Sequence, residues 1–117
     1  TKEAIANAAA WRRQNPAAFY NMQERVAMLV REARRDLEAG RLKMLGDKMN
    51  ANHELLKTLS VSTAKLDALA DAARAAGAHG AKLTGAGLGG AVIALAPKEL
   101  DLTQSLRRAG AQEVIEP

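Results

Sequence analysis

The chain of 117 residues contains no cysteine, and Phe, Tyr and Trp together make up only 3% of it. The absence of cysteine excludes disulfides, thiol catalysis and cysteine-based zinc sites. Apolar runs stay well short of the roughly 20 residues that a membrane-spanning helix needs, and no signal peptide is recognisable. We therefore expect a soluble, cytoplasmic protein without a membrane partner.

The chain also lacks a concentrated charge of one sign. Lys and Arg number 17 against 13 Asp and Glu, which gives a formal net charge of +4. A basic chain can bind nucleic acid, anionic lipid or a phosphorylated small molecule, but a charge of this size also serves ordinary solubility. Acidic and basic residues are mixed on the same helix, so we expect no nucleic-acid partner. His53, His79 and the carboxylates lack metal-ligand spacing, and no protein metal site is predicted.

Hydrophobic residues make up 48% of the chain and are rich in alanine, which favours helices. Apolar residues recur at spacings of three and four through the first two thirds of the sequence. Four helices are therefore expected, at 2–13, 16–38, 41–58 and 62–77. Asn15 and Pro16 form a helix start, Ser62 is the expected N-cap of the fourth helix, and Gly40 and Gly77 end helices.

The expected buried face of the third helix consists of Leu42, Leu45, Met49 and Leu56. Gly46 weakens this helix and so indicates close packing at that position. The methionines are interpreted as adaptable core residues, and the mixed charges of 16–38 as a solvated, ion-paired face. His53 is interpreted as a polar capping or packing residue near a helix end, and not as a proton carrier. His79 is expected at the surface.

The pattern changes near residue 80. Strands are predicted at 81–84 and 91–96, a helix at 102–109 and a last strand at 112–115. Helices followed by a strand–loop–strand–helix–strand sequence predict an α+β domain with a small antiparallel sheet packed against several helices.

The two central strands enclose four glycines within six residues, at 85–90. Glycine permits positive φ and close approach of a ligand to the backbone, and successive N–H groups in such a loop suit phosphate oxygens. Thr84 either adds a hydroxyl donor or bonds the backbone locally. Lys82 shares a strand face with Thr84 and is interpreted as a solvated charge.

The amino-acid sequence from Gly80 to Gly90 resembles the third sequence motif of the GHMP small-molecule kinases. Within this family, the segment Met49–Leu56 followed by Leu59–Ser62 is similar to the mevalonate kinases, as is the approach Ala75–Lys82. The opening Thr1–Glu3 is similar to the segment where these kinases pass from their amino-terminal to their carboxy-terminal domain. The resemblance covers nearly the whole chain and is strongest at 49–97.

This resemblance implies that residues 1–117 form a GHMP kinase C-terminal domain of ferredoxin-like fold, and that an N-terminal kinase domain lies outside the chain. It implies ATP- and Mg²⁺-dependent phosphorylation of the 5-hydroxyl of mevalonate, in isoprenoid precursor synthesis. The absent domain would bind most of the ATP and Mg²⁺ and carry the catalytic groups, so this chain alone is expected to be inactive. A homodimer is implied as well.

The resemblance also implies which residues lie beside the nucleotide phosphates. The third motif maps onto Thr84, Gly85, Ala86, Gly87, Gly89 and Gly90. Leu88 stands where many members have glycine, which leaves open whether its amide faces the ligand, and Ala91 stands where many have cysteine. Two alternatives remain: a phosphomevalonate kinase of the same superfamily, and a non-catalytic ferredoxin-like binding or dimerisation module whose glycine loop only joins two strands.

Overall fold

The computed structural model describes residues 2–85, 87–88 and 90–117. Over this part of the chain the elements are α1 (Lys2–Gln14), α2 (Pro16–Glu38), α3 (Leu42–Thr58), α4 (Ala64–Ala75), β1 (Gly80–Thr84), β2 (Ala91–Leu95) and α5 (Thr103–Arg108). The predicted α+β class, with a small antiparallel sheet against several helices, is confirmed. None of the described helices combines the length and apolar character that a membrane crossing needs.

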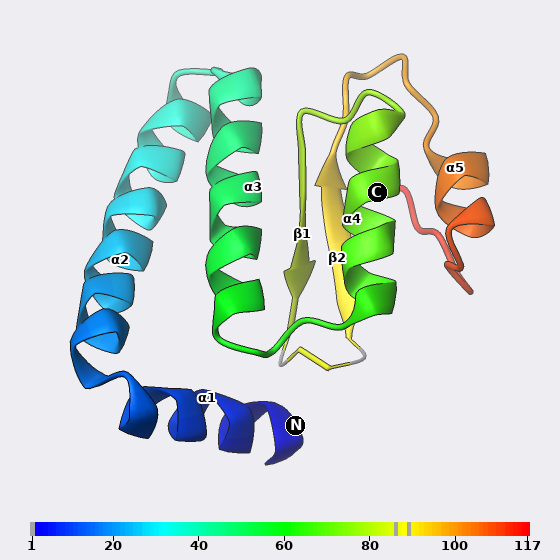
Figure 1. Ribbon diagram of the computed structural model, residues 1–117. Helices are drawn as coiled ribbons and strands as arrows, with labels where there is room; N and C mark the ends of the chain where they lie inside the picture. Colours follow the sequence, from blue (N-terminus) through cyan, green and yellow to red (C-terminus); the bar gives the residue numbers. More distant parts are fainter. Residues whose placement is uncertain (1, 86, 89) are drawn as a thin grey trace.

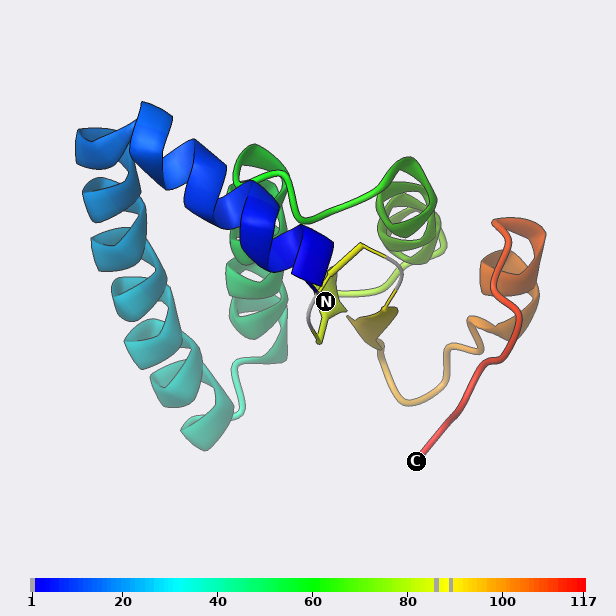
Figure 2. The same cartoon turned by 90° about the horizontal axis from the view of Figure 1, so that it is seen from below.

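In the projection of Figure 1, the elements from α2 to α5 follow one another as a row. The paired helices α2 and α3 are followed by the β1–β2 hairpin, then by α4, and α5 lies beyond α4. The view from below shows α3 along the outer edge of β1, with α4 over one face of the hairpin and α1 crossing the end of the row (Figure 2). The hairpin is antiparallel, with Gly80 opposite Leu95 and Thr84 opposite Ala91.

The helix ends follow the predicted glycines. Gly40 and Gly77 adopt φ of 71° and 111°, the left-handed region in which a side chain is strained. Asn15 occupies the N-cap position of α2, but its side chain makes no capping bond there. Its amide Nδ2 instead donates to the carbonyl of Trp11 at 3.1 Å and so joins the end of α1.

The N-cap of α4 is Thr63, so the prediction of Ser62 is wrong by one residue. The hydroxyl of Thr63 accepts from the Leu66 amide at 3.1 Å. The Ser62 hydroxyl donates to the Asp67 carboxylate at 2.6 Å instead. Two adjacent hydroxyl residues offer the same capping chemistry, and the sequence pattern does not choose between them.

A stripe of small and polar residues on α3 faces the outer edge of β1. Asn50 Oδ1 accepts from the amide of Ala81 at 2.9 Å, and His53 Nδ1 accepts from the amide of Leu83 at 3.0 Å. Gly46 is the third member, since the spacings of four and three place Gly46, Asn50 and His53 on one helix face. The side chains of Asn50 and His53 thus accept hydrogen bonds that a further strand beside β1 would otherwise accept.

This contact corrects the predicted buried face of α3. Leu42 is 41% exposed, and the other predicted face residues, Leu45, Met49 and Leu56, are partly buried. The expected face is wrong in part because the helix uses Asn50 and His53 to bind backbone groups of β1. His53 also lies in the helix interior and not near its end.

Arg74 of α4 completes the attachment at the start of β1. Its Nη2 donates to the carbonyl of Ala81 at 2.7 Å, and its Nε donates to Asn50 Oδ1 at 2.7 Å. Both backbone groups of Ala81 are thereby bonded to side chains. The surrounding core cluster is built from small residues and one leucine: Ala70, Ala73, Ala81 and Leu102.

The backbones of α3 and β1 touch at two glycines. A methyl group at Gly46 would lie 2.2 Å from the carbonyl oxygen of His79, and one at Gly80 would lie 2.3 Å from the carbonyl oxygen of Gly46. The predicted close packing at Gly46 is confirmed. His79 is partly buried and not fully at the surface as predicted, because its backbone and Cβ pack against Gly46. Its amide donates to the carbonyl of Leu95 at 2.7 Å where the hairpin begins.

The charged residues of α2 divide into an exposed and a buried set. Arg34 and Glu38 form an exposed i,i+4 ion pair at 2.9 Å, as predicted for this face. Asp36 is buried, and its carboxylate contacts Arg41 at 3.0 Å and Lys48 at 3.1 Å. Burial raises the pKa of Asp36, but the hydrogen bonds and charges of Lys48 and Arg41 outweigh it and hold the pKa below its usual value.

The methionines differ among themselves. Met22, Met28 and Met49 are partly buried, in line with adaptable packing. Met44 is 47% exposed, so the core interpretation is wrong for this residue.

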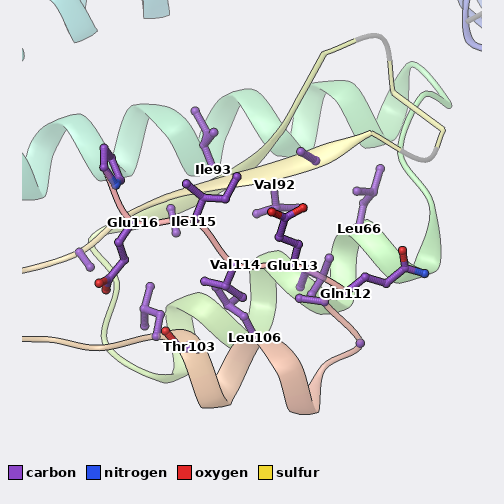
Figure 3. A pocket seen from close by; sticks show the side chains of 18 of the residues that line it. Leu66, Val92, Ile93, Thr103, Leu106, Gln112, Glu113, Val114, Ile115 and Glu116 are labelled. Carbon is purple, nitrogen blue, oxygen red and sulfur yellow. The ribbon is translucent and has the colours of Figure 1, made fainter.

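The predicted strand at 112–115 is wrong. These residues form no strand in the structure and instead line a cavity of about 1000 Å³ between β2, α4 and α5. Figure 3 shows Glu113 and Ile115 reaching toward Val92 and Ile93 of β2. A strand needs backbone hydrogen bonds to a partner edge. Side chains of α3 and α4 bind the outer edge of β1, and among the described residues the segment 112–115 makes no backbone ladder with β2.

Replacing Gly46 by alanine tests the contact between α3 and β1. Alanine stabilises an uncrowded helix position by about 1 kcal/mol, so helix propensity alone predicts a gain. The contact with His79 predicts a loss of roughly 1–3 kcal/mol in the free energy of unfolding, measured by urea denaturation. The neighbouring exposed Asp47→Ala is the control and should change stability by less than about 0.5 kcal/mol. A stabilised Gly46→Ala variant would contradict the contact.

The ion pairs of Asp36 predict a pH-dependent contribution to stability. Because the pKa of the folded state is lowered, the contribution is present above the unfolded-state pKa of about 3.9 and disappears as the pH falls through the folded-state pKa. Asp36→Asn should therefore be less stable than the wild type at pH 7, and the difference should shrink below about pH 4. Denaturation curves at a series of pH values measure it, and a difference independent of pH would refute the assignment.

Candidate functional site

The glycine-rich loop joins β1 to β2 at the end of the hairpin where Thr84 and Ala91 pair. Gly85 and Gly90 are exposed, whereas Gly87 is buried. A methyl group at Gly90 would lie 2.9 Å from the Thr84 carbonyl oxygen, so the two ends of the loop approach closely. The predicted site residues Ala86 and Gly89 lie outside the described residues.

The middle of the loop is seated on the turn between α3 and α4. The Leu88 amide donates to the carbonyl of Val61 at 2.9 Å. Gly87 has φ of 86°, and a methyl group there would lie 2.4 Å from the same carbonyl oxygen. The question left open for Leu88 is thus answered, because its amide bonds Val61 and is not directed at a ligand. Leu88 adopts φ of 51°, a conformation that costs a non-glycine residue roughly 1–2 kcal/mol.

The turn that carries the loop is itself held by the first helix. Ser60 has φ of 66°, and its carbonyl accepts from Asn7 Nδ2 of α1 at 3.0 Å. The first turns of α1 and the glycine loop lie close together in both views (Figures 1 and 2). The turn therefore connects α1, α3, α4 and the loop.

His53 lies beneath the strand that leads into the loop. It is 1% exposed, and Nδ1 accepts from the Leu83 amide. Because a backbone N–H can only donate, Nδ1 carries no proton and the ring is the neutral tautomer with its proton on Nε2. Nε2 donates to Asp67 at 2.9 Å. The prediction that His53 has a polar packing role is confirmed.

Asp67 of α4 receives hydrogen bonds from two sides. Its Oδ1 accepts from Ser62 as well as from His53. Burial raises the pKa of Asp67, but these hydrogen bonds and the positive charge of Lys57 outweigh it, and the pKa lies below its usual value. Asp67 is therefore a carboxylate at neutral pH, which fixes the tautomer of His53.

Lys82 and Thr84 lie on the face of β1 opposite to the buried Ala81 and Leu83. Lys82 is not the fully solvated charge that was predicted. It is partly buried, its Nζ donates to the carbonyl of Leu83 at 2.6 Å, and burial lowers its pKa. Thr84 is partly buried at the start of the loop.

The sequence identified the loop but missed the residues that hold it. Val61 contributes only its backbone carbonyl, which every residue possesses, so no sequence signal marks it. Asp67 reads as an ordinary helix-surface residue. The recognisable signal was the spacing of Gly46, Asn50 and His53, a small and two polar residues on one helix face. Within the described part of the chain, no three His, Asp or Glu side chains gather as a metal site requires.

Comparison with known proteins places this fold and loop in a family. A family model for the C-terminal part of GHMP kinases matches residues 33–113. The chain is 40% identical to the mevalonate kinase of Pyrococcus abyssi over 98% of its own length, and that match covers 36% of the relative. The mevalonate kinase of Pyrococcus furiosus is 54% identical over 61% of the chain and 22% of the relative.

The structure gives the same result. It resembles the L. major mevalonate kinase solved in complex with R-mevalonate, with a TM-score of 0.82 and 32% sequence identity over 92% of this chain and 33% of that protein. The chain thus spans about a third of the length of the relatives it matches. Because the family model covers residues 33–113, which is most of the chain, the chain belongs to the GHMP kinase family and corresponds to its C-terminal domain.

Proposed function

We propose that this chain is the C-terminal part of an ATP-dependent mevalonate kinase, which transfers the γ-phosphoryl group of ATP to the 5-hydroxyl of mevalonate. The observation that carries the proposal is the match of nearly the whole chain to relatives named mevalonate kinase. The fold supports it, since the similar L. major enzyme was solved with R-mevalonate. Mevalonate is accordingly the proposed acceptor here.

In this proposal the glycine-rich loop forms one wall of the phosphate site. The proposed contacts are Thr84, Gly85, Ala86, Gly87, Gly89 and Gly90. Phosphoryl transfer depends on donors positioned around the phosphate oxygens, because little covalent chemistry is left to the protein. Gly85 and Gly90 are exposed, whereas Gly87 and Leu88 attach the loop to Val61. The attached residues would hold the exposed ones in place.

The remaining parts of the reaction are assigned to an N-terminal domain outside this chain. That domain would bind Mg²⁺ and most of the ATP and would provide the acid–base groups. When bound, Mg²⁺ neutralises charge on the phosphate oxygens of ATP. The complete kinase is proposed to be cytoplasmic, to act in isoprenoid precursor synthesis and to assemble as a homodimer.

The activity of the complete protein tests this proposal. The complete kinase should phosphorylate mevalonate with ATP and Mg²⁺, and the 117-residue chain alone should give no turnover in the same coupled assay. Phosphomevalonate, assayed in parallel, distinguishes the related phosphomevalonate kinase activity. Turnover by the isolated chain would contradict the division between two domains. A complete protein without activity, whose Gly85 and Gly90 amide signals do not respond to ATP, would indicate a non-catalytic module.

The close contact between Gly87 and the Val61 carbonyl predicts the effect of Gly87→Ala. The added methyl group would meet the Val61 carbonyl and displace the loop. We expect kcat of the complete kinase to fall by roughly 10–100-fold, since a displacement of about 1 Å in a phosphoryl-transfer site has effects of that order.

Gly40→Ala is the matched control for this variant. Gly40 has a similar positive φ of 71°, but a methyl group there meets nothing within 4 Å. It introduces comparable backbone strain between α2 and α3 and should leave kcat within about twofold of wild type. Equal losses of kcat in the two variants would refute a specific role for the loop position.

A further inference from the structure

The two sides of the glycine loop are fixed by one small group of residues. Leu83, two residues before the loop, donates its amide to His53 at 3.0 Å. Leu88, inside the loop, donates its amide to Val61 at 2.9 Å. Val61 lies in the short segment between α3 and α4, which also contains Ser62. Movement of this segment or of the His53 ring is thus transmitted to the loop.

The His53 ring has little freedom to move. Nε2 is bonded to Asp67, and Asp67 is bonded in turn to Ser62 at 2.6 Å. The hydrogen-bonded chain Leu83–His53–Asp67–Ser62 ends next to Val61, because Ser62 follows Val61 directly. Val61 is the residue whose carbonyl binds the Leu88 amide. The structure therefore contains a closed connection from the entrance of the loop to its middle.

The polarity of this connection needs an explanation beyond space filling. The Leu83 amide belongs to the outer edge of β1 and requires an acceptor when buried. An apolar residue at position 53 would leave that amide unbonded. An acceptor alone would satisfy it, yet the ring also engages Asp67, which sets both its tautomer and its orientation. A ring oriented by the Asp67 carboxylate holds its other hydrogen-bond partner, the Leu83 amide, in a defined place.

We propose that His53 is a positioning residue for phosphoryl transfer. It acts through Leu83 to hold the backbone of the glycine loop at the position where the loop can contact the phosphates. Asp67 and Ser62 orient His53 and do not contact the substrates. This proposal rests on the proposed kinase function, because it assigns the loop to the phosphate site.

Two substitutions of His53 in the complete kinase separate its two hydrogen bonds. In His53→Asn the side-chain oxygen takes about the position of Nδ1 and can still accept from Leu83. In His53→Gln the amide reaches about the position of Nε2 and keeps only the bond to Asp67. We expect kcat to fall roughly tenfold in His53→Gln and no more than about threefold in His53→Asn, with KM for mevalonate changed less than twofold in both.

Asn50→Ala is the matched structural control. Asn50 also accepts an amide of β1, but at Ala81, farther from the loop. Because Asn50 Oδ1 also accepts from Arg74 Nε, Asn50→Ala should lower the melting temperature at least as much as His53→Gln, and it should leave kcat near the wild-type value. If kcat follows melting temperature through all three variants, or if His53→Asn loses as much kcat as His53→Gln, His53 has a structural role only and the proposal is overturned.

A second readout keeps this test separate from the test of kinase function. The amide NMR signals of Gly85 and Leu88 should shift in His53→Gln and stay near their wild-type positions in Asn50→Ala. If the wild-type protein phosphorylates neither mevalonate nor phosphomevalonate, the proposed function fails. Shifts confined to His53→Gln would then still support control of the loop by His53, and unchanged signals would overturn it.

Discussion

The attachment of α3 to the outer edge of β1 is the constraint on which the rest of the structure depends. A two-stranded hairpin is marginally stable by itself, and its outer edges present unpaired backbone groups. Here Gly46 allows the helix backbone to touch the strand, and Asn50 and His53 then accept the amides of Ala81 and Leu83. Arg74 binds the Ala81 carbonyl from α4. The hairpin is thereby fixed between two helices, and the bond from His53 to Leu83, next to the loop, fixes the direction in which the loop leaves.

This attachment also explains how a loop rich in glycine can be well placed. Glycines give the backbone conformational freedom, which works against the fixed donors that phosphoryl transfer requires. The structure compensates at two points, with His53 before the loop and Val61 beneath it. Under the proposed function, the exposed loop residues would contact the phosphates, and the attached residues would fix the position of the exposed ones. Leu88 fits this division because its amide is used for attachment.

The sequence predicted those features that depend on local chemistry. The helices, the hairpin, the glycine loop and the ends at Gly40 and Gly77 follow from periodicity and glycine conformation. The edge contact of α3 was not predicted, because Asn50 and His53 bond residues about 30 positions away and polar residues on a helix usually indicate solvent. The strand at 112–115 was predicted from its β-branched residues, but strand formation depends on a partner edge that local sequence does not specify. The seat on Val61 is a backbone contact and leaves no trace in the sequence.

Amide hydrogen exchange at Ala81 and Leu83 tests the central claim most directly. Both amides point away from β2, so in a bare hairpin they would exchange rapidly with solvent. The contacts with Asn50 and His53 predict that both are protected in the complete protein to a degree similar to the amides that β1 directs toward β2. Fast exchange at both positions, in a protein whose other strand amides stay protected, would contradict the attachment of α3 to β1 and the positioning of the loop derived from it.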